Sequence, residues 1–210
     1  MAFVTPHPDF DLFGLPPTQQ TVEKDVFTEH RPISILNSNS VIQFVVPTSL
    51  DEYVQLRESL LYLKFKINIK KKDGTNVTEA DWKKIAPVNY LLHSMFRQID
   101  LEFAGKSITL SPQTYAYKAR LEYDFGFTND AKKSHLTAAG AYDDYTEKKS
   151  ISENRSKFLR PTTITTDGAG DSIELMGKLH LDMAFQPRAL LGGTQLKLTL
   201  VPNELKFSLC

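Results

Sequence analysis

The stretch HSMFRQIDLEFAGKSITL, from His93 to Leu110, alternates apolar and polar residues on both sides of Ala104-Gly105-Lys106. Apolar side chains at every second position line one face of a β-strand. Gly105 stands where a short hairpin loop needs a residue with left-handed backbone. The stretch therefore predicts a β-hairpin, and it carries no obvious catalytic group.

The same period of two recurs elsewhere in the chain. Leu61–Lys70 keeps it for ten residues, so a register slip of one residue would expose its whole apolar face. Asp73-Gly74 then supplies a turn. Glu174–Gln186 and Thr194–Pro202 alternate again, and the Val- and Ile-rich Ser40–Thr48 predicts a shorter strand.

Helical character is confined to two segments, Pro112–Phe125 and Thr128–Gly140, which carry helix start and stop signals. Seven or eight alternating segments, few helices and loops of unequal length predict an all-β fold. We expect an antiparallel eight-stranded jelly-roll sandwich with one or two short helices in the connections. Periodicity leaves another Greek-key sandwich open.

The chain divides into an arm and a domain. Residues 1–32 hold five of the eleven prolines and no period, which predicts an extended N-terminal arm whose Phe10, Leu12 and Phe13 cover another surface. Residues 33–210 form the expected jelly-roll domain, with a long polar loop at about 141–171.

Composition excludes several classes of protein. Twenty-five basic and twenty-five acidic residues cancel, so no net field favours nucleic acid or an anionic membrane. Cys210 is the single cysteine, which excludes an internal disulfide framework. No secretory signal and no apolar run of transmembrane length is present. We therefore expect no membrane partner and no specific nucleic-acid binding.

His180-Leu181-Asp182 is the strongest candidate for a chemical site. His-x-Asp on a strand supplies two of the three ligands of the facial triad that holds non-haem Fe(II). No histidine follows Asp182 to complete the triad. We therefore expect His180 and Asp182 to be an outward-facing polar pair, with a metal-dependent oxygenase as a minor alternative.

The other candidate functional residues also lack the neighbouring groups that catalysis or ligand binding would need. His93 and Ser94 are expected at a strand edge, where adjacent side chains point to opposite faces. The lysine groups at Lys70–Lys72, Lys83-Lys84 and Lys132-Lys133 are diluted by acids and predict solvated loops, and Trp82 predicts a packing anchor. We therefore expect no catalytic, cofactor-binding or metal-binding residues, no cofactor, and a protein that is not an enzyme.

A longer run of residues carries a family resemblance. VNYLLHSMFRQIDLEFAGKSITLSPQTYAYKARLE, from Val88 to Glu122, resembles the signature of the major capsid proteins of Polinton (Maverick) elements and adintoviruses. Its hallmarks are Asn89, Leu92-His93-Ser94, Phe96, Gln98-Ile99-Asp100 and Thr114-Tyr115. DLFGLPPTQQTVEK, AKKSHLT at 131–137 and MGKLHLDMAFQPRALLGG at 176–193 agree, so the resemblance extends from about Asp11 to Leu209.

The resemblance implies a structural protein. Members of this family are similar to capsid proteins of eukaryotic DNA viruses, which are built from two successive jelly rolls and assemble as pseudo-hexagonal trimers. It implies self-association into trimers and a capsid shell, contact with a penton or minor capsid protein, and a virion location after assembly in the host nucleus.

The chain departs from the family pattern because it stops where the second jelly roll should begin, so it corresponds to the N-terminal half. Three explanations stay open: a fragment, a truncated or host-captured copy, and a single-barrel vertex (penton) protein. The last ranks lowest because the matched motifs belong to the first half of the larger capsid protein. A host-captured single jelly roll would act as a binding or interaction protein.

Overall fold

The computed structural model describes residues 24–34, 36, 40–78, 81, 84–109, 113–142, 155 and 171–209 of the 210-residue chain. These residues form six strands: β1 (Ile42–Val46), β2 (Leu61–Phe65), β3 (Phe96–Phe103), β4 (Lys106–Ser107), β5 (Ile173–Gly177) and β6 (Leu196–Pro202). They also form three α-helices: α2 (Leu91–Ser94), α3 (Tyr115–Gly126) and α4 (Asn129–Lys133).

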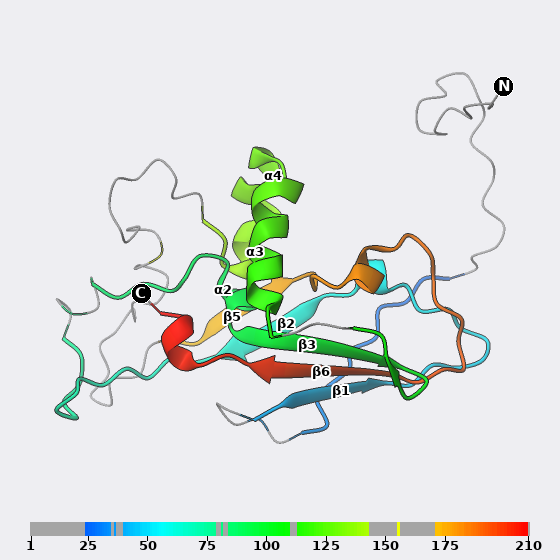
Figure 1. Ribbon diagram of the computed structural model, residues 1–210, viewed down its shortest axis with the longest axis horizontal. Helices are drawn as coiled ribbons and strands as arrows, with labels where there is room; N and C mark the ends of the chain where they lie inside the picture. Colours follow the sequence, from blue (N-terminus) through cyan, green and yellow to red (C-terminus); the bar gives the residue numbers. More distant parts are fainter. Residues whose placement is uncertain are drawn as a thin grey trace.

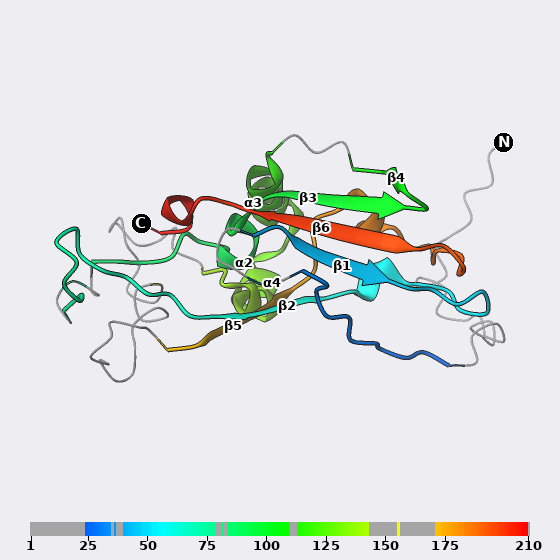
Figure 2. The same cartoon turned by 90° about the horizontal axis from the view of Figure 1, so that it is seen from below.

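The strands form two antiparallel sheets. The larger sheet has the order β1-β6-β3-β4, with Leu200 of β6 opposite both Ile42 and Ile99. The smaller sheet pairs β2 with β5, and Leu61 lies opposite Gly177. The sheets extend along the long axis of the molecule, and α3 and α4 stand on one side of them (Figures 1 and 2).

The hairpin expected from the sequence is confirmed at its turn. Ala104 (φ 50°) and Gly105 (φ 75°) both have left-handed backbone, which is the conformation of a two-residue turn that matches strand twist. Phe103 pairs with Lys106 across it. The returning strand is shorter than expected, because β4 ends at Ser107.

The predicted alternation in Leu61–Lys70 is also present. Burial alternates from one residue to the next through Lys70, but the ladder with β5 ends at Phe65. Beyond this point only bridges occur, one at Asn68 and one between Lys70 and Asn76 around the Asp73-Gly74 turn. The alternating pattern therefore marks a half-buried face over a longer stretch than the ladder with β5.

The prediction of an eight-stranded jelly-roll sandwich is wrong. The described residues form a small mixed α/β domain with six strands in sheets of four and two. Part of the difference lies in one alternating segment, Glu174–Gln186, of which only the start belongs to a strand, Ile173–Gly177. Residues 178–181 leave the β5 ladder after Gly177, and Asp182–Phe185 form a 3₁₀ turn where a strand was expected.

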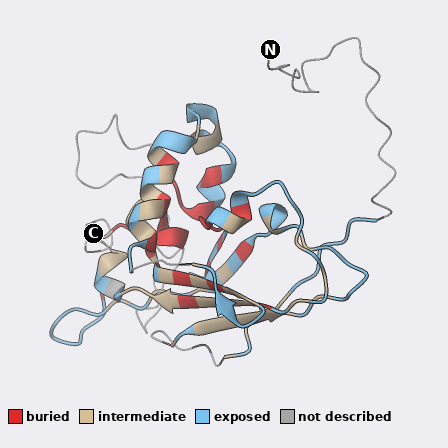
Figure 3. Ribbon diagram, turned by 45° about the vertical axis from the view of Figure 1, so that its right-hand side comes forward, coloured by how far each residue is buried: buried red, intermediate tan, exposed pale blue. Residues whose placement is uncertain are grey.

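The helices belong to the core and are more than connections, contrary to expectation. Both predicted helical segments are confirmed: α3 lies in the first, while α4 and a 3₁₀ turn (His135–Ala139) lie in the second, which ends at Gly140. Tyr115, Ala119 and Tyr123 of α3 are fully buried. They belong to one buried cluster with strand residues, and Figure 3 shows buried stretches in red on both helices and strands.

Several expectations fall outside the described residues. They concern most of the 1–32 arm, including Phe10, Leu12 and Phe13, most of the loop at 141–171, Trp82 and Cys210. The division into arm and domain therefore stays a prediction. In the described part of the chain, no helix combines the length and the apolar character needed to cross a bilayer.

Replacement of Gly177 by alanine is expected to lower the free energy of unfolding by about 1–3 kcal/mol, because overpacking forces neighbouring groups apart. A Cβ at this position would lie 3.0 Å from Leu92 Cδ2 and 3.1 Å from Ala139 Cβ. Urea denaturation measures the change. Gly126→Ala is the matched control, since that Cβ would meet no atom within 4 Å. Equal stability of the two variants would contradict this account of the packing.

Candidate functional site

The candidate site is a buried cluster of histidine and tyrosine side chains between α2, α3 and the segment after β5. Its first member is Tyr90, which precedes α2 in a left-handed conformation (φ 65°, ψ 51°). This conformation costs free energy in a residue other than glycine. The backbone N–H of Tyr90 donates to the carbonyl oxygen of Gly140 at 2.9 Å, which holds the turn in place.

His180 lies at the centre of the cluster. The hydroxyl of Tyr90 donates to His180 Nε2 at 2.6 Å, and His180 Nδ1 donates to Glu122 Oε2 at 2.5 Å. Both ring nitrogens therefore have partners, one from α3 and one from the start of α2. The rings of Phe127 and Phe185 pack against the imidazole.

The Tyr115 hydroxyl joins His180 to a second histidine. It accepts the backbone N–H of His180 at 3.2 Å and lies 2.9 Å from His93 Nδ1. Since the hydroxyl hydrogen remains available, it donates to Nδ1, and neutral His93 then carries its proton on Nε2. Among the described residues, His93 Nε2 has no hydrogen-bond partner.

Burial controls the protonation of the cluster. The exposed fractions of His93 and His180 are 1% and 2%. Burial lowers the pKa of His93 well below its ordinary value, and the neighbouring His180 adds to this. Burial also lowers the pKa of His180, although Glu122 opposes the shift. Burial raises the pKa of Tyr90 and of Tyr115, so all four groups are neutral near neutral pH.

The order Tyr90, His180, Glu122 resembles a nucleophile, a base and an orienting acid, but its setting opposes catalysis. An activated nucleophile needs a lowered pKa and a path for substrate. Tyr90 is buried and its pKa is raised. The hydrogen bonds therefore connect α3 both with α2 and with the segment after β5, and they fix how these parts pack.

The two histidines do not lie where the sequence predicted. His180 was expected to face outward on a strand, but it is buried because the chain after Gly177 packs beneath α3. His93 was expected at a strand edge, but it lies in α2. Asp182 is exposed and bonds to Lys118 at 2.5 Å. No group of three potential metal ligands occurs among the described residues.

Sequence reasoning missed three members of the cluster: Tyr90, Tyr115 and Glu122. Tyr115 lies on the buried face of α3 with Ala119 and Tyr123, at a spacing of four residues. That spacing predicts a buried face. It does not indicate which polar group the hydroxyl meets, because His180 is 65 residues away along the chain.

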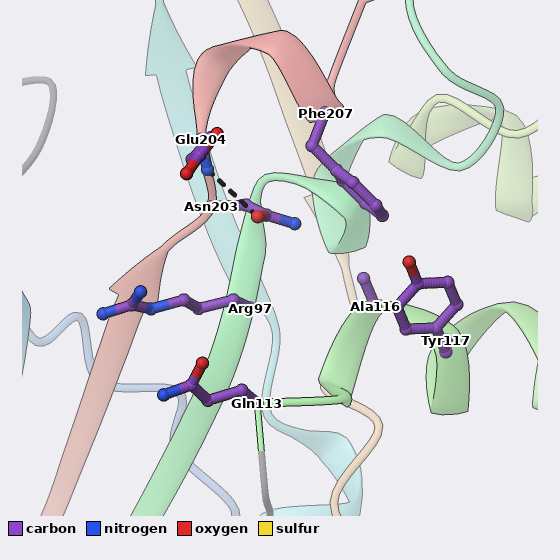
Figure 4. A pocket seen from close by; sticks show the side chains of 7 residues that line it. All are labelled: Arg97, Gln113, Ala116, Tyr117, Asn203, Glu204 and Phe207. Atoms are coloured by element: carbon purple, nitrogen blue, oxygen red, sulfur yellow. Dashed lines mark hydrogen bonds between the residues drawn. The ribbon is translucent and has the colours of Figure 1, made fainter.

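A separate pocket of about 320 Å³ opens beside the first turn of α3. Arg97 and Gln113 line one side of it, and Tyr117 and Phe207 line the other (Figure 4). The rings of Tyr117 and Phe207 meet edge to face, 5.8 Å apart. The pocket is open and lies on the surface, apart from the buried cluster.

The fold and the cluster together define a small mixed α/β domain with a buried, hydrogen-bonded group of histidine and tyrosine side chains. No protein-family model matches the chain. It is 27% identical over 198 residues to "Uncharacterized protein F54H12.2" of Caenorhabditis elegans, a match that covers 92% of this chain and 45% of that protein. The chain thus spans less than half the length of this relative.

Proposed function

We propose that this chain is a structural, self-associating protein of capsid type, as its sequence signature implies. The observation that carries the proposal is where the polar residues of the signature lie. His93 and Tyr115 are buried and bond to each other across the interior, and the buried Ser94 donates to the carbonyl oxygen of Leu91 in its own helix. Polar residues that form internal hydrogen bonds are typical of a rigid module and not of a reactive surface.

Asn89 of the signature has the same kind of role. Its side chain accepts the backbone N–H of Tyr142 at 2.8 Å and donates to the carbonyl oxygen of Tyr142 at 2.6 Å. These two hydrogen bonds hold the segment after Gly140 against the turn before α2. The signature therefore contributes to the stiffness that a shell subunit needs.

More than half of the C. elegans relative lies outside the match, which leaves room in that protein for a further module. Because the domain is not a jelly roll, the proposal depends on the signature and not on the fold class. Trimers, contact with a penton or minor capsid protein, and nuclear assembly belong to the same proposal.

A second candidate is a binding protein that acts as a monomer. The pocket beside Tyr117 favours it, since a segment of another protein could enter there. This function needs no copy of the chain as its partner.

Sedimentation velocity and electron microscopy of the full chain separate the two candidates. The capsid-type function predicts trimers or larger particles as the protein concentration rises. Each assembly interface buries apolar surface, so association should strengthen with the stabilising salts that favour burial. A monomer at every concentration and salt condition would contradict the capsid-type function and favour the binding protein.

A further inference from the structure

Two buried histidines hold α3 to its neighbours. The Tyr115 hydroxyl lies 2.9 Å from Nδ1 of His93, which belongs to α2, and it accepts the backbone N–H of His180 at 3.2 Å. Glu122 accepts the Nδ1 hydrogen of His180, which lies in the segment after β5. Helix α3 itself stands on one side of the sheets, next to α2 (Figure 1). The attachment of α3 therefore depends on the protonation of these two imidazoles.

His93 cannot take up a second proton in this arrangement without the loss of a hydrogen bond. Its neutral ring accepts the Tyr115 hydroxyl hydrogen at Nδ1, which is where the second proton would bind. The Tyr115 oxygen would then face two N–H donors, and its own hydrogen would lose its acceptor. Nε2 offers no compensation, since it has no hydrogen-bond partner among the described residues. A buried charge without such partners is costly.

The titratable side chains that face His93 do not include an acid. They are Tyr115 from α3, His180 from the segment after β5, and Tyr90, whose ring centroid lies 4.3 Å from that of His93. The carboxylate of the cluster, Glu122, bonds to His180 instead. The His180 ring lies 4.6 Å from the His93 ring, so a proton on either histidine opposes a proton on the other.

Three further elements pack against α2: β3, β5 and the 3₁₀ turn at 135–139. The charged and titratable side chains of these elements are exposed or paired with other residues: Arg97, Asp100, Glu102, His135 and Glu174. Within the part of the chain that the structure describes, no carboxylate therefore balances a proton on His93.

His180 differs from His93 because a carboxylate faces it directly. The Glu122 side chain has an exposed fraction of 33% and so connects the buried imidazole with water. Lys118 lies 3.7 Å from the other carboxylate oxygen of Glu122 and also bonds to the exposed Asp182. The positive charge of Lys118 opposes a proton on His180. Acid therefore reaches the cluster from the side of Glu122, but both histidines are neutral while α3 is in place.

We propose that His93 and His180 form a pH switch: mild acid releases α3 from α2 and from the segment after β5 while the two sheets stay paired. Release brings both imidazoles into water, where each can carry a proton without being a buried charge. The six strands contain no histidine, the side chain whose ordinary pKa lies in this range. Their ladders therefore have no group of their own to titrate, and the inference does not depend on the proposed function.

The size of the response follows from the histidine pKa. Burial keeps His93 neutral while α3 is in place, and in the released form its pKa returns to about 6.5. Protons then bind to the released form, so the opening equilibrium rises about 25-fold as the pH falls from 7 to 5. His180 adds a smaller factor, because Glu122 opposes the lowering of its pKa.

Amide hydrogen exchange of the full chain, followed by NMR at pH 7 and pH 5, tests the switch. Protection factors correct for the direct effect of pH on exchange, and those of Ala119 and Tyr123 in α3 should fall about 25-fold or more. At both pH values these amides should be roughly tenfold or more less protected than the amides of β6, and less sensitive to low urea, because local release exposes less surface than unfolding. Equal protection and equal urea sensitivity of helix and sheet would overturn the inference, as would helix protection that does not change with pH.

His93→Asn tests whether His93 accepts the proton. The amide oxygen of asparagine can accept the Tyr115 hydroxyl where Nδ1 did, but the amide takes up no proton in this range of pH. The fall in α3 protection should therefore shrink to the smaller part that His180 supplies. A fall as large as in the unchanged chain would contradict the role of His93. If the variant does not fold, the comparison of helix and sheet in the unchanged chain still decides.

Discussion

Replacement of Tyr115 by phenylalanine is expected to lower the free energy of unfolding by about 2–4 kcal/mol, since two buried polar groups lose their partner together. The lost hydroxyl accepts the backbone N–H of His180 and donates to His93 Nδ1. Both groups are enclosed by protein and cannot turn to water. Urea denaturation near neutral pH, where both histidines are neutral, measures the loss.

Tyr117→Phe is the matched control for this substitution. It removes the same atom from the same helix, but from an exposed side chain, so it should change stability by less than about 0.5 kcal/mol. The effect of Tyr115→Phe should also shrink in a His93→Phe background, because one of the two orphaned partners is then absent. A Tyr115 effect as small as the Tyr117 effect would show that the hydroxyl is not part of the packing.

The elements that the sequence predicted correctly are those whose signals are local. The turn at Ala104-Gly105 depends on left-handed backbone, which glycine favours. Thr128 or Asn129 was expected to open the second helical segment, and the side chain of Thr128 accepts the backbone N–H of Ala131. In both cases the decisive atoms lie within four residues of each other, so the sequence alone contains the information.

The errors have one physical source: alternation indicates which side chains are buried, but not what covers them. Leu179 and Leu181 were expected to point inward, and both are buried. On a strand His180 would then point outward. It is buried as well, because the chain there has left the ladder and lies under α3, where Glu122 supplies a carboxylate from 58 residues away. A partner at that distance leaves no periodic signal in either segment.

Helix α3 shows a related limit. Apolar residues occur on two sides of this helix at a spacing of four residues, so the spacing alone predicts two possible buried faces. The structure shows that the core uses the face of Tyr115, Ala119 and Tyr123, while Tyr117, Leu121 and Phe125 are exposed.

Acid is expected to destabilise the protein between about pH 7 and about pH 5. His93 and His180 have a pKa below their ordinary value of 6.5 because they are buried. The unfolded chain therefore binds protons first as the pH falls, and stability decreases with decreasing pH. A histidine that stays neutral in the folded state costs up to about 1.4 kcal/mol per pH unit below 6.5.

The two histidines should not contribute equally. His93 has no acid partner among the described residues, so it should lower the free energy of unfolding throughout the fall from pH 7 to 5. Glu122 opposes the lowering of the His180 pKa, so His180 contributes over a narrower range of pH. A combined loss of about 2–3 kcal/mol between the two pH values follows. Urea denaturation at pH 7, 6 and 5 measures it.

The lowered pKa values of carboxylates such as Asp81 and Glu174 cannot produce this slope. A carboxyl with a lowered pKa contributes stability above its unfolded pKa, near 4, and loses it only below that pH. His93→Phe should therefore flatten the decline between about pH 7 and 5 even though it lowers stability at pH 7. Equal slopes in the unchanged protein and in His93→Phe would mean that the buried imidazole accepts a proton without loss of the fold.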